Sequence, residues 1–253
     1  MLALFTGTGT AMRKAAADAP DTPERSRFFG RSKGKKLRQV QASVFEVLIP
    51  QLLIRLADLE TSSPDDFLKG LFAFEPTELR MEIGFGGGEH LLKRALENPM
   101  VGFIGCEPFV NGMAKLLMEV HRLDVRNIRV FDNDATKLLR RWPKSSIAAI
   151  DLLYPDPWPK RKQRKRRFIS DESLRLLADI IQPGGPFRFA SDIDNYVGWT
   201  LQRIFASDQW EWASMDAKDW LEPYEGWIRT RYEAKAVEEG RIPSYLTFLR
   251  RDV

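Results

Sequence analysis

The sequence predicts an α/β protein in which a mostly parallel sheet carries helices on both faces. Two observations support this prediction. From residue 79 onward, short apolar runs alternate with segments whose apolar residues recur at helical spacing. A glycine-rich turn at residues 84–88 separates the first apolar run from the first helical segment, as in open sheets that bind ligands at the carboxyl ends of their strands. Such alternation brings successive strands together in parallel and buries both faces of the sheet.

The chain is predicted to form an arm followed by one domain. Residues 1–36 are rich in Ala, Gly, Thr, Asp and basic residues and lack a sustained apolar period. We interpret them as a flexible basic arm. Residues 37–253 have the length and apolar content of a single domain with a sizeable core.

The first predicted elements come before the strand–helix alternation. Apolar residues at helical spacing predict a helix over 37–48, which Pro50 should end or kink. Residues 61–78 contain two prolines and indicate a loop, with a short helix at about 67–72.

The remaining elements follow from the alternation itself. Asp171 is the predicted N-cap of its helix, and the glycine pair at 184–185 should stop that helix. The last two apolar runs should form a closing antiparallel pair. Strands are predicted at 79–84, 101–106, 128–131, 147–154, 186–190, 210–213 and 245–250, and helices at 89–97, 110–122, 135–141, 171–181 and 194–205.

Composition excludes several classes of protein. The chain has a single cysteine, Cys106, so it can form no intramolecular disulfide, and a reducing cytoplasm fits. With two histidines and one cysteine, we expect no His/Cys-rich zinc site and no other metal. No apolar run approaches the roughly 18 residues of a membrane span. Composition leaves a monomer and a homodimer equally open.

The glycine-rich turn predicts a small-molecule site. Glycines between a strand and a helix permit positive φ and let a ligand approach the backbone closely. The dinucleotide pattern G-x-G-x-x-G would need a glycine where Glu89 stands, which argues against a nicotinamide-dependent oxidoreductase. The turn instead has Gly84, Gly86 and Gly88 in a G-x-G-x-G pattern. The alternative is a turn that only packs.

Acidic residues follow the next two strands. Glu107 stands directly after the second strand, where a carboxylate can accept hydrogen bonds from both ribose hydroxyls. The alternative is a solvated acid at a strand end. Asp134 follows the third strand, where it can accept from an exocyclic adenine amine or cap the next helix, and the two roles are compatible.

The loop after the fourth strand predicts chemistry on a nucleic-acid base. In Tyr154-Pro155-Asp156-Pro157-Trp158-Pro159, the prolines make a stiff loop that holds one carboxylate between two aromatic rings. Enzymes commonly hold a flipped base by stacking and by hydrogen bonds to its polar edge. Core packing of Trp158 is the alternative.

Residues 160–167 are basic at every position except Gln163. Beside the expected ligand crevice, such a run favours contact with phosphates, although charge runs are more often solvated surfaces. Because of its charge, we expect this run to be disordered without its ligand. Farther along the chain, Asp192 ends the fifth strand on the crevice side and is a candidate site residue, whereas Asp194 is a predicted helix cap.

Together these residues resemble the bacterial tRNA (guanine-N7-)-methyltransferase family over about 79–250. The similarity lies in the combination E-I-G-F-G-x-G, G-x-E, D-A, P-D-P-W-x-K with a basic run, and a late T-[KR]-[FY]-E. It implies the class I S-adenosylmethionine-dependent methyltransferase fold, which is Rossmann-like with a mostly parallel seven-stranded sheet. It also implies methylation of N7 of guanosine 46 in the variable loop of tRNA, and hence S-adenosyl-L-methionine as cofactor and tRNA as partner. Pro159 departs from the family, in which a histidine is frequent at this position.

The resemblance also implies roles for individual residues. Asp156 would be catalytic and would line the cofactor site together with Glu82, Glu107 and Asp134. The substrate would contact Lys160, Asp192, Thr230, Arg231, Tyr232 and Glu233, and the RNA would contact Lys162, Arg164, Lys165, Arg166 and Arg167.

Two other classes remain open at this stage. A methyltransferase acting on another RNA, a protein or a small molecule would keep the cofactor residues but leave the basic run without a purpose. A non-catalytic RNA-binding module would keep the basic run but leave the acidic residues without one.

Overall fold

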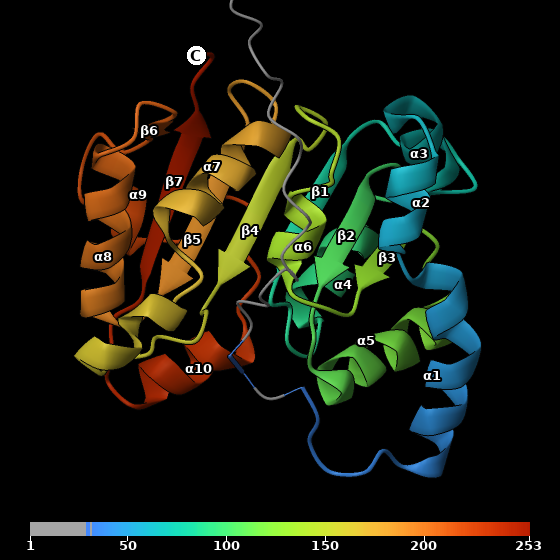
Figure 1. Cartoon of the computed structure of the whole chain (residues 1–253). Coiled ribbons are helices and arrows are strands. Elements are labelled where there is room, and N and C mark those ends of the chain that lie inside the picture. Colours follow the sequence, from blue (N-terminus) through green and yellow to red (C-terminus); the bar gives the residue numbers. More distant parts are fainter. Residues whose placement is uncertain (1–28, 31) are drawn as a thin grey trace, which may run out of the picture.

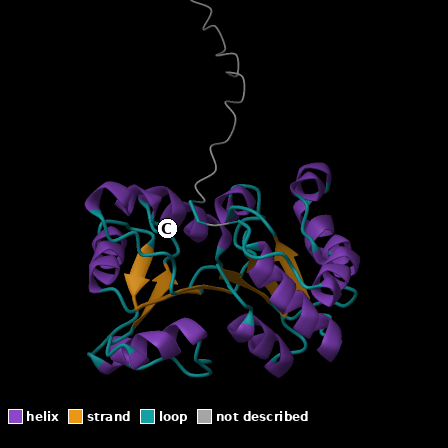
Figure 2. Cartoon of the chain, turned by 90° about the horizontal axis from the view of Figure 1, so that it is seen from below, coloured by secondary structure: helices purple, strands orange, loops and turns teal. Residues whose placement is uncertain are grey.

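The computed structural model describes residues 29–30 and 32–253, so most of the predicted arm lies outside the described residues. The described chain forms one seven-stranded sheet between two layers of helices, as Figures 1 and 2 show. The strands are β1 (Leu79–Ile83), β2 (Gly102–Cys106), β3 (Ile128–Phe131), β4 (Ala149–Leu153), β5 (Pro186–Ser191), β6 (Trp210–Trp212) and β7 (Ser244–Arg250).

Ten α-helices and one 3₁₀ helix accompany the sheet in the described part of the chain. They are α1 (Gln39–Leu52), α2 (Leu56–Thr61), α3 (Pro64–Gly70), α4 (Glu89–Glu97), α5 (Val110–Leu123), α6 (Ala135–Leu139), η1 (Arg161–Arg166), α7 (Asp171–Ile180), α8 (Asp194–Phe205), α9 (Lys218–Leu221) and α10 (Arg231–Glu238). None of the described helices is long and apolar enough to cross a membrane.

The strand order is β3-β2-β1-β4-β5-β7-β6. The first five strands of this order pair in parallel, and β7 runs antiparallel to both β5 and β6. The predicted fold class and its closing antiparallel pair are therefore confirmed. The order reverses between β1 and β4, and the carboxyl ends of these two strands border the crevice where open α/β sheets bind ligands.

Side-chain alternation divides the core between the two faces of the sheet. On β2, Ile104 packs into the cluster formed with α6, α7 and α8, whereas Phe103 packs into the cluster formed with α4 and α5. On β1, Ile83 belongs to the first face, and Glu82 consequently lies on the second. The next strands, β4 and β5, also place charged residues on the second face.

Several element boundaries differ from the prediction. Pro50 lies within α1, which continues to Leu52. The helix persists because Phe45, Leu48, Ile49 and Leu52 pack against the α4–α5 cluster, and Pro50 costs it only one hydrogen bond in its last turn. The predicted loop over 61–78 contains α3, in which Pro64 takes the first helical position after the N-cap Ser63.

Two predicted helix caps were wrong by one residue. Ser170, not Asp171, caps α7, because its hydroxyl accepts from the backbone N–H of Ser173. Asp194 is the first residue of α8, whose N-cap is Ile193. Each aspartate therefore lies in a first helical turn, where its charge is favourable to the helix dipole.

Candidate active site

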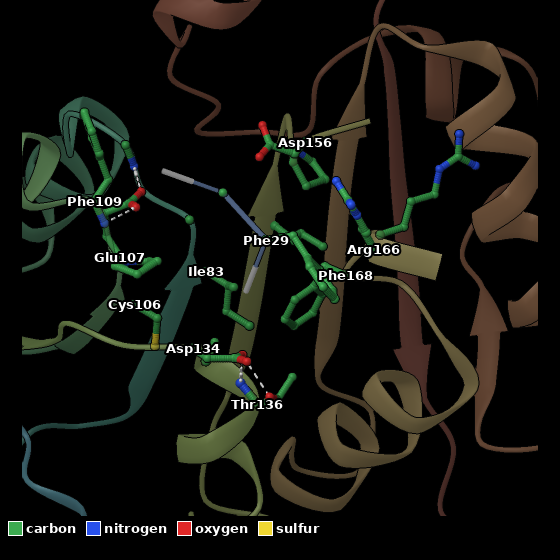
Figure 3. A pocket seen from close by; sticks show the side chains of 18 of the residues that line it. Phe29, Ile83, Cys106, Glu107, Phe109, Asp134, Thr136, Asp156, Arg166 and Phe168 are labelled. Atoms are coloured by element: carbon green, nitrogen blue, oxygen red, sulfur yellow. Dashed lines mark hydrogen bonds between the residues drawn. The ribbon is translucent and has the colours of Figure 1, made fainter. Parts of the chain in front are cut away.

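A cavity of about 360 Å³ opens at the carboxyl ends of β1, β2 and β4. Figure 3 shows Glu107 and Phe109 on one side of it and Arg166 and Phe168 on the other. Its floor is apolar, with Ile83, Cys106 and Leu152, and its acidic groups come from the ends of successive strands. This is the arrangement of a site for a ligand with both polar and apolar parts.

The glycine-rich turn forms one wall of this cavity. Gly84 and Gly86 line it, and both have positive φ values, 74° and 58°, which favour glycine. A Cβ atom on Gly86 would also stand 3.4 Å from the ring of Tyr232. Gly88 does not line the cavity but begins α4 as an N-cap in the left-handed conformation. The turn therefore exposes backbone to the cavity at two of its three predicted glycines.

Glu107 is held rigidly by the backbone around it. Its carboxylate accepts from the N–H of Gly86 at 2.7 Å and from the N–H of Phe109 at 2.9 Å. Burial raises the pKa of Glu107, although both N–H groups act in the opposite direction. Each carboxylate oxygen can accept a further hydrogen bond, so the fixed group remains able to bind two ligand hydroxyls.

Asp134 caps α6, as one of its two predicted roles requires. Its carboxylate accepts from the backbone N–H of Thr136 at 3.0 Å and from the Thr136 hydroxyl at 2.8 Å. The residue is buried and lines the cavity. The cap fixes the direction of the carboxylate, and its predicted contact with adenine remains compatible with this geometry.

Asp156 stands at the rim of the cavity in a strained loop. Tyr154 and Trp158, on either side of it, have φ values of 51° and 40°, which are unusual for residues other than glycine. Strain of this kind concentrates at functional sites. Desolvation raises the pKa of the Asp156 carboxyl, and among the described residues it has no hydrogen-bond or ion-pair partner.

The basic run has a defined conformation, contrary to the expectation of disorder. It forms η1, and the Arg166 guanidinium lies 4.9 Å from the ring centroid of Trp158 and 5.4 Å from that of Phe29. Arg167 is only 4% exposed. It donates to the carbonyl of Pro157 at 2.8 Å and to Asn195, and therefore ties the Asp156 loop to α8.

Comparison with known proteins assigns the family. A family model described as "Putative methyltransferase" matches residues 76–243. A tRNA (guanine-N(7)-)-methyltransferase of Mesorhizobium japonicum is 53% identical over 233 residues, which cover 91% of this chain and 98% of that protein. One of the same name from Agrobacterium fabrum is 55% identical over 224 residues, covering 88% and 95%. The chain belongs to the tRNA (guanine-N7-)-methyltransferase family.

Solved structures support the fold of this family member. The 16S rRNA methyltransferase KamB has a TM-score of 0.51 at 18% identity, covering 70% of this chain and 89% of that one. A 16S rRNA (adenine(1408)-N(1))-methyltransferase of Catenulisporales acidiphilia also has a TM-score of 0.51, at 15% identity, covering 76% and 94%. The class I methyltransferase fold is thus shown.

Two residues implied by the family resemblance, Glu82 and Asp192, are placed away from the cavity wall. Glu82 is buried on the second face of the sheet and pairs with His90 at 2.8 Å. Asp192 pairs with Arg241 at 2.5 Å. The buried guanidinium of Arg167 does reach the cavity wall, but its hydrogen bonds within the protein do not favour contact with RNA.

The family's late motif forms the start of α10. Thr230 and Glu233 make a capping box, in which each side chain bonds the backbone N–H of the other residue. Of its four residues, only Tyr232 lines the cavity, and Arg231 lies beside it with its guanidinium 4.8 Å from the Tyr232 ring centroid. The substrate contacts of this motif remain predictions.

Some of the residues that line the cavity were not predicted from the sequence. Phe29 and Phe168 line the cavity, but neither belongs to a recognisable motif. Cys106 also lines it, and burial raises the pKa of its thiol so that it is not a thiolate nucleophile. The position of Cys106 at the end of β2 was the available signal.

Proposed function

We propose that this chain transfers a methyl group from S-adenosylmethionine to N7 of guanine in tRNA, at guanosine 46 of the variable loop. The observation that carries the proposal is the cavity itself. Glu107 and Asp134 lie in it at the ends of β2 and β3, and Asp156 stands at its mouth in a strained loop next to a cationic helix. The names of the relatives give methylation of guanine N7 in tRNA but no position in the tRNA.

The residues of the cavity fit the proposed cofactor. Glu107 is fixed by two backbone N–H groups with further acceptor capacity toward a ribose. Asp134, whose carboxylate is fixed because it caps α6, can accept from an exocyclic amine. Ile83 and Leu152 provide apolar surface for a purine ring, and the turn at Gly84 and Gly86 admits a ligand close to the backbone.

Asp156 has the geometry of a group that orients the target base. When bound, S-adenosylmethionine supplies an electrophilic methyl group on a sulfonium centre. N7 of guanine carries a lone pair and no proton, so no residue is needed as a base to create the nucleophile. Asp156 accepts from the N1–H and N2–H edge of guanine, which aims N7 at the cavity and stabilises the positive charge that develops on the purine.

The aromatic and basic residues around Asp156 bind the RNA. Trp158 stacks on the target guanine or forms a wall of its pocket. Lys160, Lys162 and Lys165 are exposed on or beside η1 and contact phosphates. A second basic segment, residues 33–38, lies on the α5 side of the cavity and carries exposed Lys33, Lys35 and Lys36.

A methyl-transfer assay with mapping of the product tests the function. The purified protein is incubated with an unmodified tRNA transcript and radiolabelled S-adenosylmethionine, and the RNA is then treated with borohydride and aniline. We expect label in the RNA and strand cleavage in the variable loop. Transfer without cleavage there would contradict the proposed position or atom. Cofactor binding without transfer to tRNA would favour a methyltransferase with another acceptor.

A further inference from the structure

The second face of the sheet has a buried row of charges. Glu82 on β1, Asp151 on β4 and Arg188 on β5 occupy neighbouring positions in the strand register. Glu82 is 5% exposed and Asp151 is 7% exposed. Buried charges are costly unless they are paired and hydrogen-bonded. These side chains therefore need hydrogen-bond partners from the segments that cover this face of the sheet.

The partners come from α4 and from the segment between α9 and α10, residues 222–230, here called the α9–α10 linker. His90 of α4 has its Nδ1 at 2.8 Å from Glu82 and its Nε2 at 3.3 Å from the Tyr224 hydroxyl. That hydroxyl donates to Asp151 at 3.3 Å, and Asp151 also pairs with Arg188 at 3.5 Å. One continuous hydrogen-bonded row therefore joins the sheet to the linker.

The partners of His90 follow from these bonds. The Tyr224 hydroxyl donates to Asp151, so it accepts from Nε2 of His90. Nδ1 of His90 faces the carboxylate of Glu82, which accepts only. Both ring nitrogens of His90 therefore have a hydrogen-bond partner, Glu82 at Nδ1 and the Tyr224 hydroxyl at Nε2. Burial lowers the pKa of His90, but Glu82 and Asp151 outweigh it and raise that pKa overall.

The α9–α10 linker in turn contacts α10. The Tyr224 and Trp227 rings pack edge to face with centroids 5.2 Å apart. Trp227 Nε1 donates to Glu233 at 2.7 Å, and the Tyr245 hydroxyl donates to the same carboxylate at 2.8 Å. Glu233 is the residue that closes the capping box of α10. The first turn of α10 is thus fixed from the linker side.

The first turn of α10 in turn presents Tyr232 to the cavity. The Tyr232 ring lies against Gly86, where a Cβ atom would be 3.4 Å from Cε2 of the ring. Figure 1 shows α10 across the end of the sheet at which β4 and β5 terminate. The Tyr232 side chain is 46% exposed, and its hydroxyl accepts a hydrogen bond from Arg231 of the same helix at 3.0 Å. Its place depends on the element that carries it.

We propose that Glu82, His90, Asp151 and Tyr224 are positioning residues that hold α10 so that Tyr232 closes the cofactor cavity over Gly86. The proposal rests on the proposed function in taking the cavity as the S-adenosylmethionine site. It gives the family's Glu82 a role that is exerted through α10 and not through a place on the cavity wall. It also explains why three charged residues occupy the interior of this face.

Tyr224→Phe is the principal test, because it keeps the ring and removes only the hydroxyl shared by His90 and Asp151. Binding of S-adenosylhomocysteine is measured by calorimetry. We expect its Kd to rise roughly three- to tenfold, because part of the free energy of the two lost hydrogen bonds should reach the cavity through α10. The matched control is Ser146→Ala, which removes a hydroxyl that also has two partners, at the other end of the sheet. Its Kd should be that of the wild type.

A double-mutant cycle distinguishes positioning from general loss of structure. In a Tyr232→Ala background, Tyr224→Phe should change the Kd little, because the side chain that it positions is already gone. Equal effects of Tyr224→Phe in the two backgrounds would overturn the proposal, as would an unchanged Kd in the single variant.

Hydrogen exchange of the free protein tests the same coupling without a cofactor. Tyr224→Phe should speed exchange at the amides of α10 and leave α7 unchanged. Equal exchange at α10 in the two proteins would contradict the proposal. A wild-type protein that binds no S-adenosylhomocysteine would refute the proposed function, whereas the exchange experiment would still decide whether the buried row holds α10.

Discussion

At the scale of residues, the site depends on carboxylates that differ in how they are held. Glu107 and Asp134 were predictable because each follows a strand whose carboxyl end reaches the crevice, and backbone N–H groups fix both. Asp156 is different, since no backbone N–H of the described residues holds its carboxylate and its strained loop is held by the bonds of Arg167 to Pro157 and Asn195. Glu82 was predicted to line the cavity, but the alternation of β1 that buries Ile83 on one face places Glu82 on the other.

Asp156→Asn should separate activity from stability. We expect kcat for tRNA methylation to fall about 10²–10³-fold, as when other groups that stabilise developing charge are removed. The raised pKa of Asp156 means that its contribution to stability is present at acid pH and lost as pH rises through that pKa. The ionised group therefore disfavours folding at neutral pH, so the variant should melt no lower than the wild type.

The raised pKa also predicts the pH profile of the wild type. The carboxylate of the free enzyme is protonated as pH falls through the raised pKa, so kcat/KM should decline at a pH above the ordinary aspartate value of about 3.9. The residual activity of Asp156→Asn should lack this acid limb. Near wild-type kcat in the variant, or an acid limb that persists in it, would show that Asp156 does not act on the base.

At the scale of elements, local sequence patterns can predict where a helix begins when they contain a capping motif. They mislead where tertiary packing determines whether a segment is helical or ordered. The pattern Thr230-x-x-Glu233 is the signature of a capping box and could have predicted the start of α10. Of the two effects predicted for Pro50, an end or a kink, the end is wrong, because tertiary contacts allow α1 to continue to Leu52. Charge alone wrongly predicted disorder for η1, whose order depends on stacking by Arg166 and burial of Arg167.

The exposed lysines of η1 should provide salt-dependent affinity. Replacement of Lys160, Lys162 and Lys165 by Ala removes charges that make no ion pair with described residues. We expect a higher KM for tRNA and a slope of log affinity against log salt that is shallower by about 2–3, at roughly 0.7–0.9 per phosphate contact. The kcat at saturating tRNA should change little.

Two controls accompany the lysine variant. Replacing Lys69, Lys93 and Lys218, which are exposed on other helices, should leave the slope unchanged. Arg167→Ala should instead lower the free energy of unfolding by about 2–4 kcal/mol, because it removes a buried side chain together with its hydrogen bonds to Pro157 and Asn195 and its contacts with the Tyr196 and Trp199 rings. If Arg167→Ala made the salt slope as shallow as the lysine variant does, Arg167 would contact RNA, which would contradict its structural role.

At the scale of the molecule, the strand order explains why distant segments meet at one cavity. Residues from the ends of β1, β2, β3 and β4 converge there because parallel strands end at the same edge of the sheet. This convergence was predictable from the alternation of elements. The approach of Phe29 to the cavity was not predictable, and neither was the packing of residues 32–36 against α5, because no periodicity or motif indicates them.

Residues 32–36 form a second basic surface at the mouth of the cavity. Asn111 of α5 accepts from the N–H of Gly34 and donates to the carbonyl of Lys35, each at 2.7 Å. The N–H of Val110 bonds the carbonyl of Ser32 at 3.0 Å. These bonds hold Lys33, Lys35 and Lys36 on the side of the cavity opposite η1. An RNA that places its base at Asp156 can therefore meet basic residues on both sides.

Asn111→Ala tests whether this surface must be held in place. Without the two side-chain hydrogen bonds, the segment has to be ordered by the RNA, so we expect the KM for tRNA to rise about two- to tenfold. The Kd for S-adenosylhomocysteine should stay unchanged, because Asn111 does not line the cavity. Ser43→Ala, which removes a hydroxyl bond on exposed α1, is the control and should alter neither constant. An unchanged KM for tRNA in Asn111→Ala would mean that η1 alone supplies the RNA contacts near the target base, and a raised cofactor Kd would mean that the segment closes the cavity instead of guiding RNA to it.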